Sequence, residues 1–166
     1  MQATKLTVRD LMQKKVVRLE PSTTVREAIE LIEDAGITGA PVVDASGTVL
    51  GVVSLRDLAQ ASEAGSGTVA GRRSEFYLAD ADEDRPYGEA DELSDVEDYS
   101  PAAMRDGTVA EWMTTELVTV EPTDSVRAAA RKMTEHKVHR VLVLEDGRLK
   151  GILTSTDIVR FVADNG

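Results

Sequence analysis

The chain has 166 residues, a formal net charge of −11 and 42% apolar residues, with aromatics only 4%. This length suits one globular domain, or two small domains that share a core. The lack of cysteine excludes disulfides and thiolate chemistry, and no apolar run approaches the roughly 18 residues of a membrane span. The first residues lack the apolar stretch of a signal peptide, so we expect a cytoplasmic protein without membrane contact.

An internal repeat dominates the sequence. Residues 7–57 recur as residues 108–157, with 13 identities over 50 aligned columns and a single gap in a glycine-containing turn. A repeat of this length determines the architecture more strongly than any single motif does. The sequence therefore predicts a first unit at 7–61, an acidic connector at 62–107 and a second unit at 108–164.

Each unit begins with a predicted strand and helix. The β-rich runs 16–19 and 117–120 are both followed by Glu-Pro, and proline ends a strand because it cannot donate to the ladder. Thr24 and Ser125 stand where helix N-caps belong, and Thr24 has the spacing of a capping box. Apolar residues then recur at i, i+3, i+4 and i+7 in both copies, namely Val25, Ala28, Ile29 and Ile32, and Val126, Ala129, Ala130 and Met133.

The two predicted helices end differently. Gly36 follows the first one and suits the left-handed residue that often terminates a helix. Its counterpart is Lys137, which is strained if the geometry is the same.

A hairpin and a final helix complete each unit. Hairpins are predicted at 41–53 and 141–153, with turns at Ser46-Gly47 and Asp146-Gly147. The final helices are expected to begin near Arg56 and Thr156 and to carry apolar side chains inward, namely Leu58, Ile158 and Val159. One unit has too few helices to cover its sheet, so two units must pack together. The predicted fold class is α/β, with two pseudo-symmetric β-α-β-β-α units packed through their sheets.

The connector holds most of the negative charge. It contains 13 Asp and Glu against four Arg, a net charge of −9, which is typical of a long surface loop or a partly disordered segment. It also contains four of the six aromatic residues, so we expect parts of it to pack on the repeats or on a second subunit. These aromatic residues are Phe76, Tyr77, Tyr87 and Tyr99. Without a basic stripe, the chain is a poor partner for nucleic acid.

Both units end in the same motif, GVVSLRD at 51–57 and GILTSTD at 151–157. Together with the segments 36–44 and 136–146, these motifs resemble those of CBS domains in tandem, the assembly called a Bateman module. The resemblance covers both repeats and leaves the connector unexplained. It implies a stand-alone regulatory module that pairs into homodimers and binds an adenosine-containing ligand such as AMP, ADP, ATP or S-adenosylmethionine, with or without magnesium.

The resemblance also assigns ligand contacts. The motif's Asp, here Asp57 or Asp157, holds the ribose hydroxyls, and the Ser or Thr, here Ser54 or Thr154, contacts phosphate. A helix N-terminus supports that contact because its N–H groups and dipole attract anions. Residues around the two bases are Val16, Thr38, Ala40 and Pro41, and Leu117, Val138 and Val141. His139 and Arg140 are placed at the phosphates of the second unit.

Plainer interpretations remain open for these residues. Ser/Thr-x-x-Asp at a helix start is also close to a capping box, which needs no ligand. Arg140 could instead pair with an acidic neighbour, and His139 could simply fill the surface. His136 and His139 alone do not complete a metal site, so no metal ligand is predicted.

Two functions follow as hypotheses. The first is a ligand-sensing regulatory module that requires no cofactor. The alternative is a ligand-free dimerisation or protein-interaction module, in which the acidic connector contacts a protein effector. No nucleophile–base arrangement, P-loop or dinucleotide motif is present, so neither an enzyme nor any catalytic residue is predicted.

Overall fold

The protein is described here by a computed structural model that covers residues 6–63, 75–77 and 107–165. The predictions for Tyr87, Tyr99 and most of the connector lie outside these residues. The first unit contains α1 (Val8–Leu11), α2 (Val25–Asp34), β1 (Gly39–Val43), β2 (Val49–Ser54) and α3 (Leu55–Glu63). After the short 3-10 helix η1 (Glu75–Tyr77), the second unit contains α4 (Val109–Trp112), β3 (Thr119–Val120), α5 (Val126–His136), β4 (Arg140–Glu145), β5 (Arg148–Thr154) and α6 (Ser155–Asn165).

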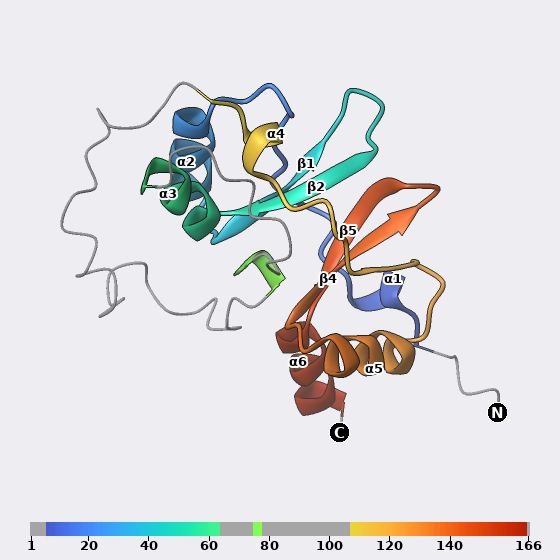
Figure 1. The fold of residues 1–166 in the computed structure, drawn as a ribbon. Coiled ribbons are helices and arrows are strands. Elements are labelled where there is room, and N and C mark those ends of the chain that lie inside the picture. The colour runs from blue at the N-terminus through green and yellow to red at the C-terminus, as the bar shows by residue number, and fades with distance from the viewer. Residues whose placement is uncertain (1–5, 64–74, 78–106, 166) are drawn as a thin grey trace.

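The predicted pair of α/β units is confirmed. β1 and β2 form one antiparallel hairpin, while β4 pairs with β5 antiparallel and with β3 parallel. The two hairpins lie next to each other, with α2 and α3 at one end of the β1–β2 hairpin and α5 and α6 at one end of the β4–β5 hairpin (Figure 1). Their turns meet, since Val49 N–H donates to Gly147 O and Leu149 N–H donates to Gly47 O, both at 3.2 Å. The buried residues form two hydrophobic clusters, and each contains residues of both copies of the repeat: Val8, Val43, Val49 and Val52 lie in the second unit's cluster, and Val109 lies in the first unit's.

The predicted first strands are shorter than expected. Residues 117–120 yield only the two-residue β3, and residues 16–19 yield an isolated parallel bridge from Leu19 to Val42. Leu142 N–H donates to Val118 O at 3.1 Å in the second unit. Pro41 stands at the matching place in the first unit and has no N–H to donate, so this strand pairing is weaker there.

The predicted N-caps and helical stripes are confirmed. Thr24 Oγ1 accepts from Glu27 N–H, and the Glu27 carboxylate accepts from Thr24 N–H, completing a capping box. Ser125 Oγ accepts from Ala128 N–H at 3.1 Å. All apolar stripe residues are buried except Ala130, which is half-buried. α2 and α5 thus pack through the faces that their sequences predict.

The helix ends also match the prediction. Gly36 has φ +64°, and Lys137 has φ 53° and ψ 49°, so both are left-handed. The same backbone geometry is therefore built with a glycine in one copy and with a lysine in the other.

The final helices begin one residue earlier than predicted, at Leu55 and Ser155. Leu58 is fully buried as expected, but Val159 is 66% exposed, so its predicted inward position is wrong. α6 packs against α5, α1 and β5, and these contacts leave Val159 on its outer side.

The segments that open each unit are exchanged between the units. α1 packs on α5 and α6, and α4 packs on α3 and β2. Gln13 pairs with Ile152, and Thr114 pairs with Val52, through short antiparallel bridges. The repeated motif glycine makes this approach possible, because a Cβ on Gly151 would lie 2.6 Å from the Gln13 carbonyl oxygen. Each unit is thus completed by residues that precede the other unit's first strand.

Part of the connector belongs to the core, as its aromatic content predicted. Phe76 and Tyr77 are 0% and 1% exposed, and their rings pack edge to face with centroids 5.1 Å apart. η1 lies between the two hairpins and contacts β1, β2 and β4 (Figure 1).

Candidate functional site

We group the predicted ligand contacts into two matching sets. The first half-site is Val16, Thr38, Ala40, Pro41, Ser54 and Asp57. The second half-site is Leu117, Val138, His139, Arg140, Val141, Thr154 and Asp157. Within each unit, the turn between the hairpin's second strand and the final helix carries the hydroxyl and the carboxylate.

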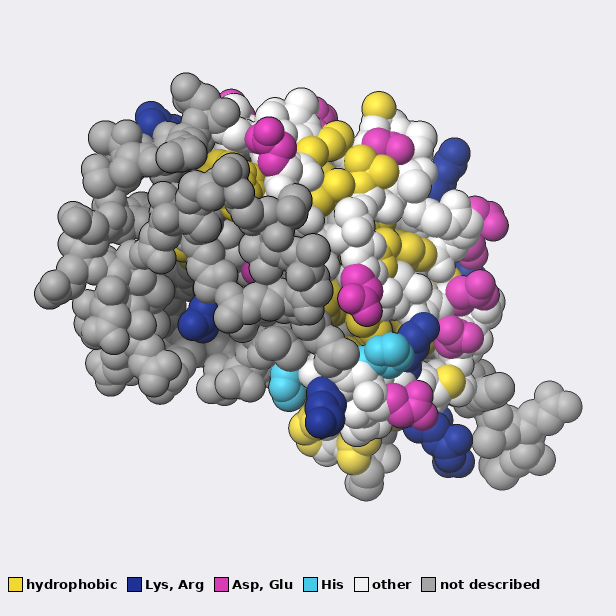
Figure 2. All heavy atoms as spheres, in the orientation of Figure 1, with side chains coloured by type: hydrophobic (Ala, Val, Ile, Leu, Met, Phe, Trp, Pro, Cys, Tyr) yellow, Lys and Arg dark blue, Asp and Glu magenta, His cyan; other side chains and the backbone are white. Residues whose placement is uncertain are grey.

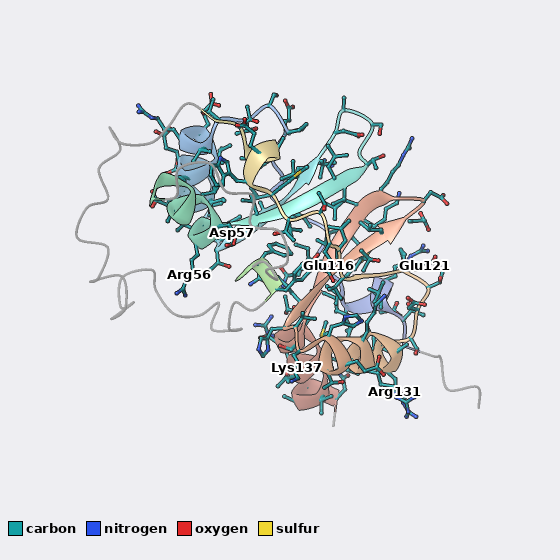
Figure 3. All side chains as sticks on the ribbon, in the orientation of Figure 1. Arg56, Asp57, Glu116, Glu121, Arg131 and Lys137 are labelled. Carbon is teal, nitrogen blue, oxygen red and sulfur yellow. The ribbon has the colours of Figure 1, made fainter. Side chains whose placement is uncertain are left out.

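In the first half-site, Ser54 and Asp57 form a reciprocal cap at the start of α3. Ser54 N–H donates to Asp57 Oδ2 at 2.9 Å, and Asp57 N–H donates to Ser54 Oγ at 3.0 Å. Ser54 is buried, while Asp57 is half-buried. Figure 3 shows Asp57 at the end of α3 that faces the middle of the molecule, with Arg56 beside it. A carboxylate is therefore held at the N-terminus of a nine-residue helix.

The second half-site repeats this cap and adds a further contact. Thr154 N–H donates to Asp157 Oδ2 at 2.9 Å, and Asp157 N–H donates to Thr154 Oγ1 at 3.2 Å. Gln13 also reaches this carboxylate from the exchanged segment, with Nε2 3.1 Å from Oδ1 and 3.3 Å from Oδ2. Nothing in the repeat pattern suggested Gln13, because its position depends on the exchange.

The capping-box interpretation is thus confirmed in both units. It does not exclude a ligand, since an ionised carboxylate has about four lone-pair sites and accepts several hydrogen bonds at once. Asp57 and Asp157 can therefore cap their helices and still accept from a diol.

The strand residues of the two sets differ in exposure. Ala40 and Val141 are fully buried in the core, so neither residue presents surface to a ligand. Pro41 and Val138 are also buried, Val16 and Leu117 are half-buried, and Thr38 and His139 are exposed. The carbonyl groups of Thr38 and His139 accept from Leu55 N–H and Ser155 N–H at 2.9 and 2.8 Å. The two half-sites thus have the same backbone frame.

Arg140 breaks the symmetry between the units. Gly39 occupies its place in the first unit, and a Cβ there would lie 3.2 Å from Phe76 Cδ2. The Arg140 side chain is buried, and its Cζ lies 5.2 Å from the centroid of the Phe76 ring, a cation–π distance. Phe76 thus lies between matching positions of the two units.

Tyr77 contacts the backbone of the second half-site directly. His139 N–H donates to the Tyr77 carbonyl at 2.8 Å, and Val118 N–H donates to the Tyr77 hydroxyl at 3.0 Å. Burial raises the pKa of Tyr77 from 10.0 to about 12, so the phenol keeps its proton at alkaline pH values where an exposed tyrosine would lose it. The connector's aromatic content predicted packing of this kind, but not where it would occur.

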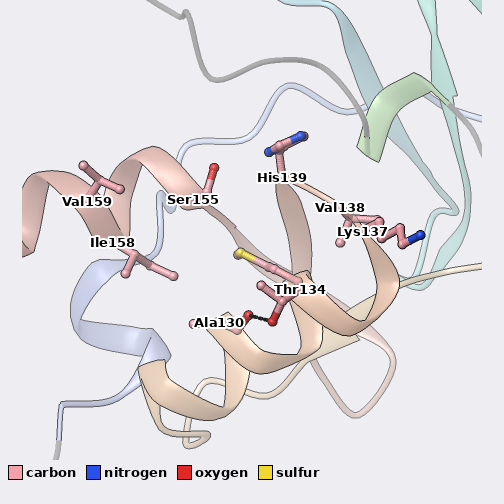
Figure 4. Close-up of a pocket in the computed structure, with 9 residues that line it drawn as sticks. Ala130, Thr134, Lys137, Val138, His139, Ser155, Ile158 and Val159 are labelled. Carbon is pink, nitrogen blue, oxygen red and sulfur yellow. Dashed lines mark hydrogen bonds between the residues drawn. The ribbon is translucent and has the colours of Figure 1, made fainter.

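A separate groove of about 440 Å³ lies between α5 and α6 (Figure 4). Its lining is mainly apolar and includes Met133, Ile158 and Val159, with Lys137 and His139 at one end. Figure 2 shows both histidines on one face beside basic side chains, with apolar side chains below them. Val162 on α6 is also 60% exposed. This surface includes Val138 and His139 of the second half-site but neither Thr154 nor Asp157.

Known proteins resemble this chain along most of its length. The family model for the CBS domain matches residues 8–64 and 109–164. The chain is 32% identical over 143 residues to the chloroplastic CBS domain-containing protein CBSX2 of Arabidopsis thaliana, covering 86% of this chain and 56% of that relative. Chloroplastic CBSX1 of the same plant is 33% identical over 158 residues, covering 93% and 63%. The chain thus spans less than two thirds of the length of either relative.

A solved structure supports the same grouping. The crystal structure of CBSX2 in complex with AMP aligns with a TM-score of 0.65 and 28% identity, covering 96% of this chain and 97% of that one. Among residues 6–63, 75–77 and 107–165, no helix is long and apolar enough to cross a membrane. Because relatives include chloroplastic proteins, the cytoplasmic location stays a prediction.

Proposed function

The chain belongs to the CBS domain family, and on this basis we propose that it is a regulatory module that binds an adenosine-containing nucleotide between its two units. Residues 7–61 and 108–164 are the sensing units in this proposal, and 62–107 is the connector. The bound ligand produces a regulatory output by shifting the chain from one conformation to another. This shift requires that the ligand bind the two conformations with different affinities.

One observation carries the proposal: a hydroxyl and a carboxylate are held together at the N-terminus of α3, beside the exposed Thr38. The helix N-terminus favours phosphate, and Ser54 adds a hydroxyl there. Asp57 can accept hydrogen bonds from both hydroxyls of a ribose. The pairing of CBSX2 with AMP in its crystal structure supports an adenine nucleotide as the ligand class.

A second observation supports self-association. The groove between α5 and α6 and the exposed Val159 and Val162 leave apolar surface uncovered on the second unit. We propose that a second copy of the chain covers this surface, in agreement with the family's tendency to pair its modules. A dimer of this kind also serves the alternative function, a ligand-free interaction module whose effector is a protein.

A thermal-shift series tests nucleotide binding. AMP, ADP, ATP, S-adenosylmethionine and GTP are each titrated against the chain, with and without magnesium. A ligand that binds only the folded state at 100 times its Kd stabilises it by about 2.7 kcal/mol, so Tm rises with concentration. We expect a rise with adenine ligands and its loss in Asp57→Asn.

Glu27→Gln is the matched control, because it alters the same position of a capping box on α2. It should lower Tm slightly and leave the ligand response intact. Flat curves with every ligand, on a chain that unfolds cooperatively, would instead support the ligand-free module.

A further inference from the structure

Tyr77 is hydrogen-bonded to backbone N–H groups that a base in the second half-site would use. Val118 N–H and His139 N–H belong to the strand segments predicted to surround that base, and both donate to Tyr77. Tyr77 is 1% exposed and packs in a hydrophobic cluster that contains Val118, Val141 and Leu142 of the second unit together with Val43 and Val52 of the first. A flat, buried aromatic ring with one hydrogen-bonding edge therefore already lies there, and it resembles a nucleobase in shape and polarity.

The carboxylate of the second half-site is also engaged by the protein. Gln13 Nε2 donates to Asp157 within 3.3 Å of both oxygens. These are the oxygens that a ribose diol would approach. Two residues from outside the second unit's own sequence thus contact this half-site. Tyr77 accepts hydrogen bonds from the groups on the base side, and Gln13 donates to the carboxylate on the sugar side.

The first half-site is different. The groups that match Val118 N–H and His139 N–H are Val17 N–H and Thr38 N–H, and neither has a protein acceptor within the described ranges. Both residues are exposed. Pro41 explains part of this difference, because it cannot donate to the Val17 carbonyl, so this segment pairs with β1 only at Leu19.

Phe76 anchors the segment that carries Tyr77. It is fully buried, packs edge to face on Tyr77 and lies 5.2 Å from Arg140 Cζ. Gly39 permits its approach on the first unit, because any side chain there would meet the Phe76 ring. Phe76 therefore holds η1 in place from both units, while the hydrogen bonds of Tyr77 go to Val118 and His139 of the second.

We infer that Tyr77 is an internal occupant of the second half-site and that the chain binds one nucleotide, in the first half-site. This inference rests on the proposed function, because it decides which of two matching sites the nucleotide enters. Tyr77 is then a specificity-determining residue: its removal, with that of Gln13, opens a second site on the same backbone frame.

Isothermal titration calorimetry with AMP tests this inference. The wild-type chain is expected to bind one AMP, and Asp57→Asn is expected to lose at least tenfold in affinity. Tyr77→Ala, alone or with Gln13→Ala, is expected to bind two AMP molecules per chain. Adding Asp157→Asn to these variants should reduce this number to one. Two AMP per wild-type chain, or undiminished binding by Asp57→Asn, would overturn this inference and leave the proposed function standing. No AMP binding by either the wild type or Tyr77→Ala would overturn this inference, and flat thermal-shift curves with every adenosine-containing ligand would overturn the proposed function as well.

Amide hydrogen exchange on the wild-type chain covers the case in which Tyr77→Ala does not fold. The amides of Val118 and His139 should be protected before and after AMP is added. The amides of Val17 and Thr38 should exchange freely and slow down at least tenfold with AMP. New protection confined to the second unit would show that AMP displaces Tyr77, contrary to the inference.

Discussion

Gln13 and Asp157 are joined by a hydrogen bond of 3.1 Å although they lie 144 positions apart in the chain. Gln13 belongs to the segment that opens the first unit, and Asp157 belongs to the last helix of the second. The contact exists because the opening segments are exchanged. The exchange in turn depends on the motif glycines Gly51 and Gly151, where a Cβ would lie within 2.8 Å of a backbone oxygen of the opening segment.

Gly151→Ala is expected to destabilise the protein. The new methyl group would lie 2.6 Å from the Gln13 carbonyl oxygen and 3.1 Å from Met12 Sδ. A backbone oxygen cannot move aside by side-chain rotation, so the whole segment must shift, at a cost of about 1–3 kcal/mol. Urea denaturation measures the free energy of unfolding. Lys150→Ala, at the exposed neighbouring position, should change it little, and equal effects from the two variants would contradict the crossing geometry.

Lys137→Gly is expected to stabilise the protein, and Gly36→Lys is expected to destabilise it. Both positions are left-handed, with φ 53° and 64°. Lysine is strained in this region, whereas glycine is not, although glycine loses more backbone entropy on folding. The net change should be about 0.5–1 kcal/mol at each position, with opposite signs, in chemical denaturation. The same sign for both substitutions would refute the proposed equivalence of the two helix ends.

Alkaline pH is expected to weaken the fold through Tyr77. Its pKa is raised from 10.0 in the unfolded chain to about 12 in the folded one, chiefly by burial. Below pH 10 both states hold the proton, and between pH 10 and 12 only the folded state does. The free energy of unfolding therefore falls across this window, by roughly 2–3 kcal/mol for this group.

The control for this effect is the variant Tyr77→Phe, because phenylalanine has no ionisable hydroxyl group. Its unfolding free energy should be lower at neutral pH, because Val118 N–H loses its acceptor, and should decline less between pH 10 and 12. The wild-type minus Tyr77→Phe difference in absorbance near 295 nm should titrate with a midpoint near pH 12. A midpoint near 10 would mean that Tyr77 is accessible to water.

Val159→Glu is expected to disrupt self-association. Val159 lines the groove between α5 and α6 and is 66% exposed, so a charge there should not disturb the monomer. Sedimentation analysis should find dimers for the wild type and monomers for the variant, with the same circular dichroism. Lys150→Glu, on the exposed side of β5, should remain dimeric. A monomeric wild-type chain would contradict the proposed self-association through this groove.

Much of the fold could be predicted from local patterns. The caps at Thr24 and Ser125, the stripe of α2 and the left-handed ends at Gly36 and Lys137 each depend on a few neighbouring residues. The predicted first strand is reduced to a single bridge in the first unit, because strand pairing depends on a distant partner and Pro41 there has no N–H to donate.

The sequence alone determined that two similar α/β units are present, where α2 and α5 begin, and that each unit carries a hydroxyl–carboxylate turn at the start of its final helix. Repeats, caps and apolar periods are properties of adjacent residues, so they can be recognised without a tertiary structure. Only the tertiary structure placed Gln13 on Asp157 and Tyr77 on Val118 and His139. These contacts join segments at least 40 residues apart, and they form because the opening segment of the first unit and part of the connector pack against the second unit. Those contacts are what make the two matching half-sites unequal.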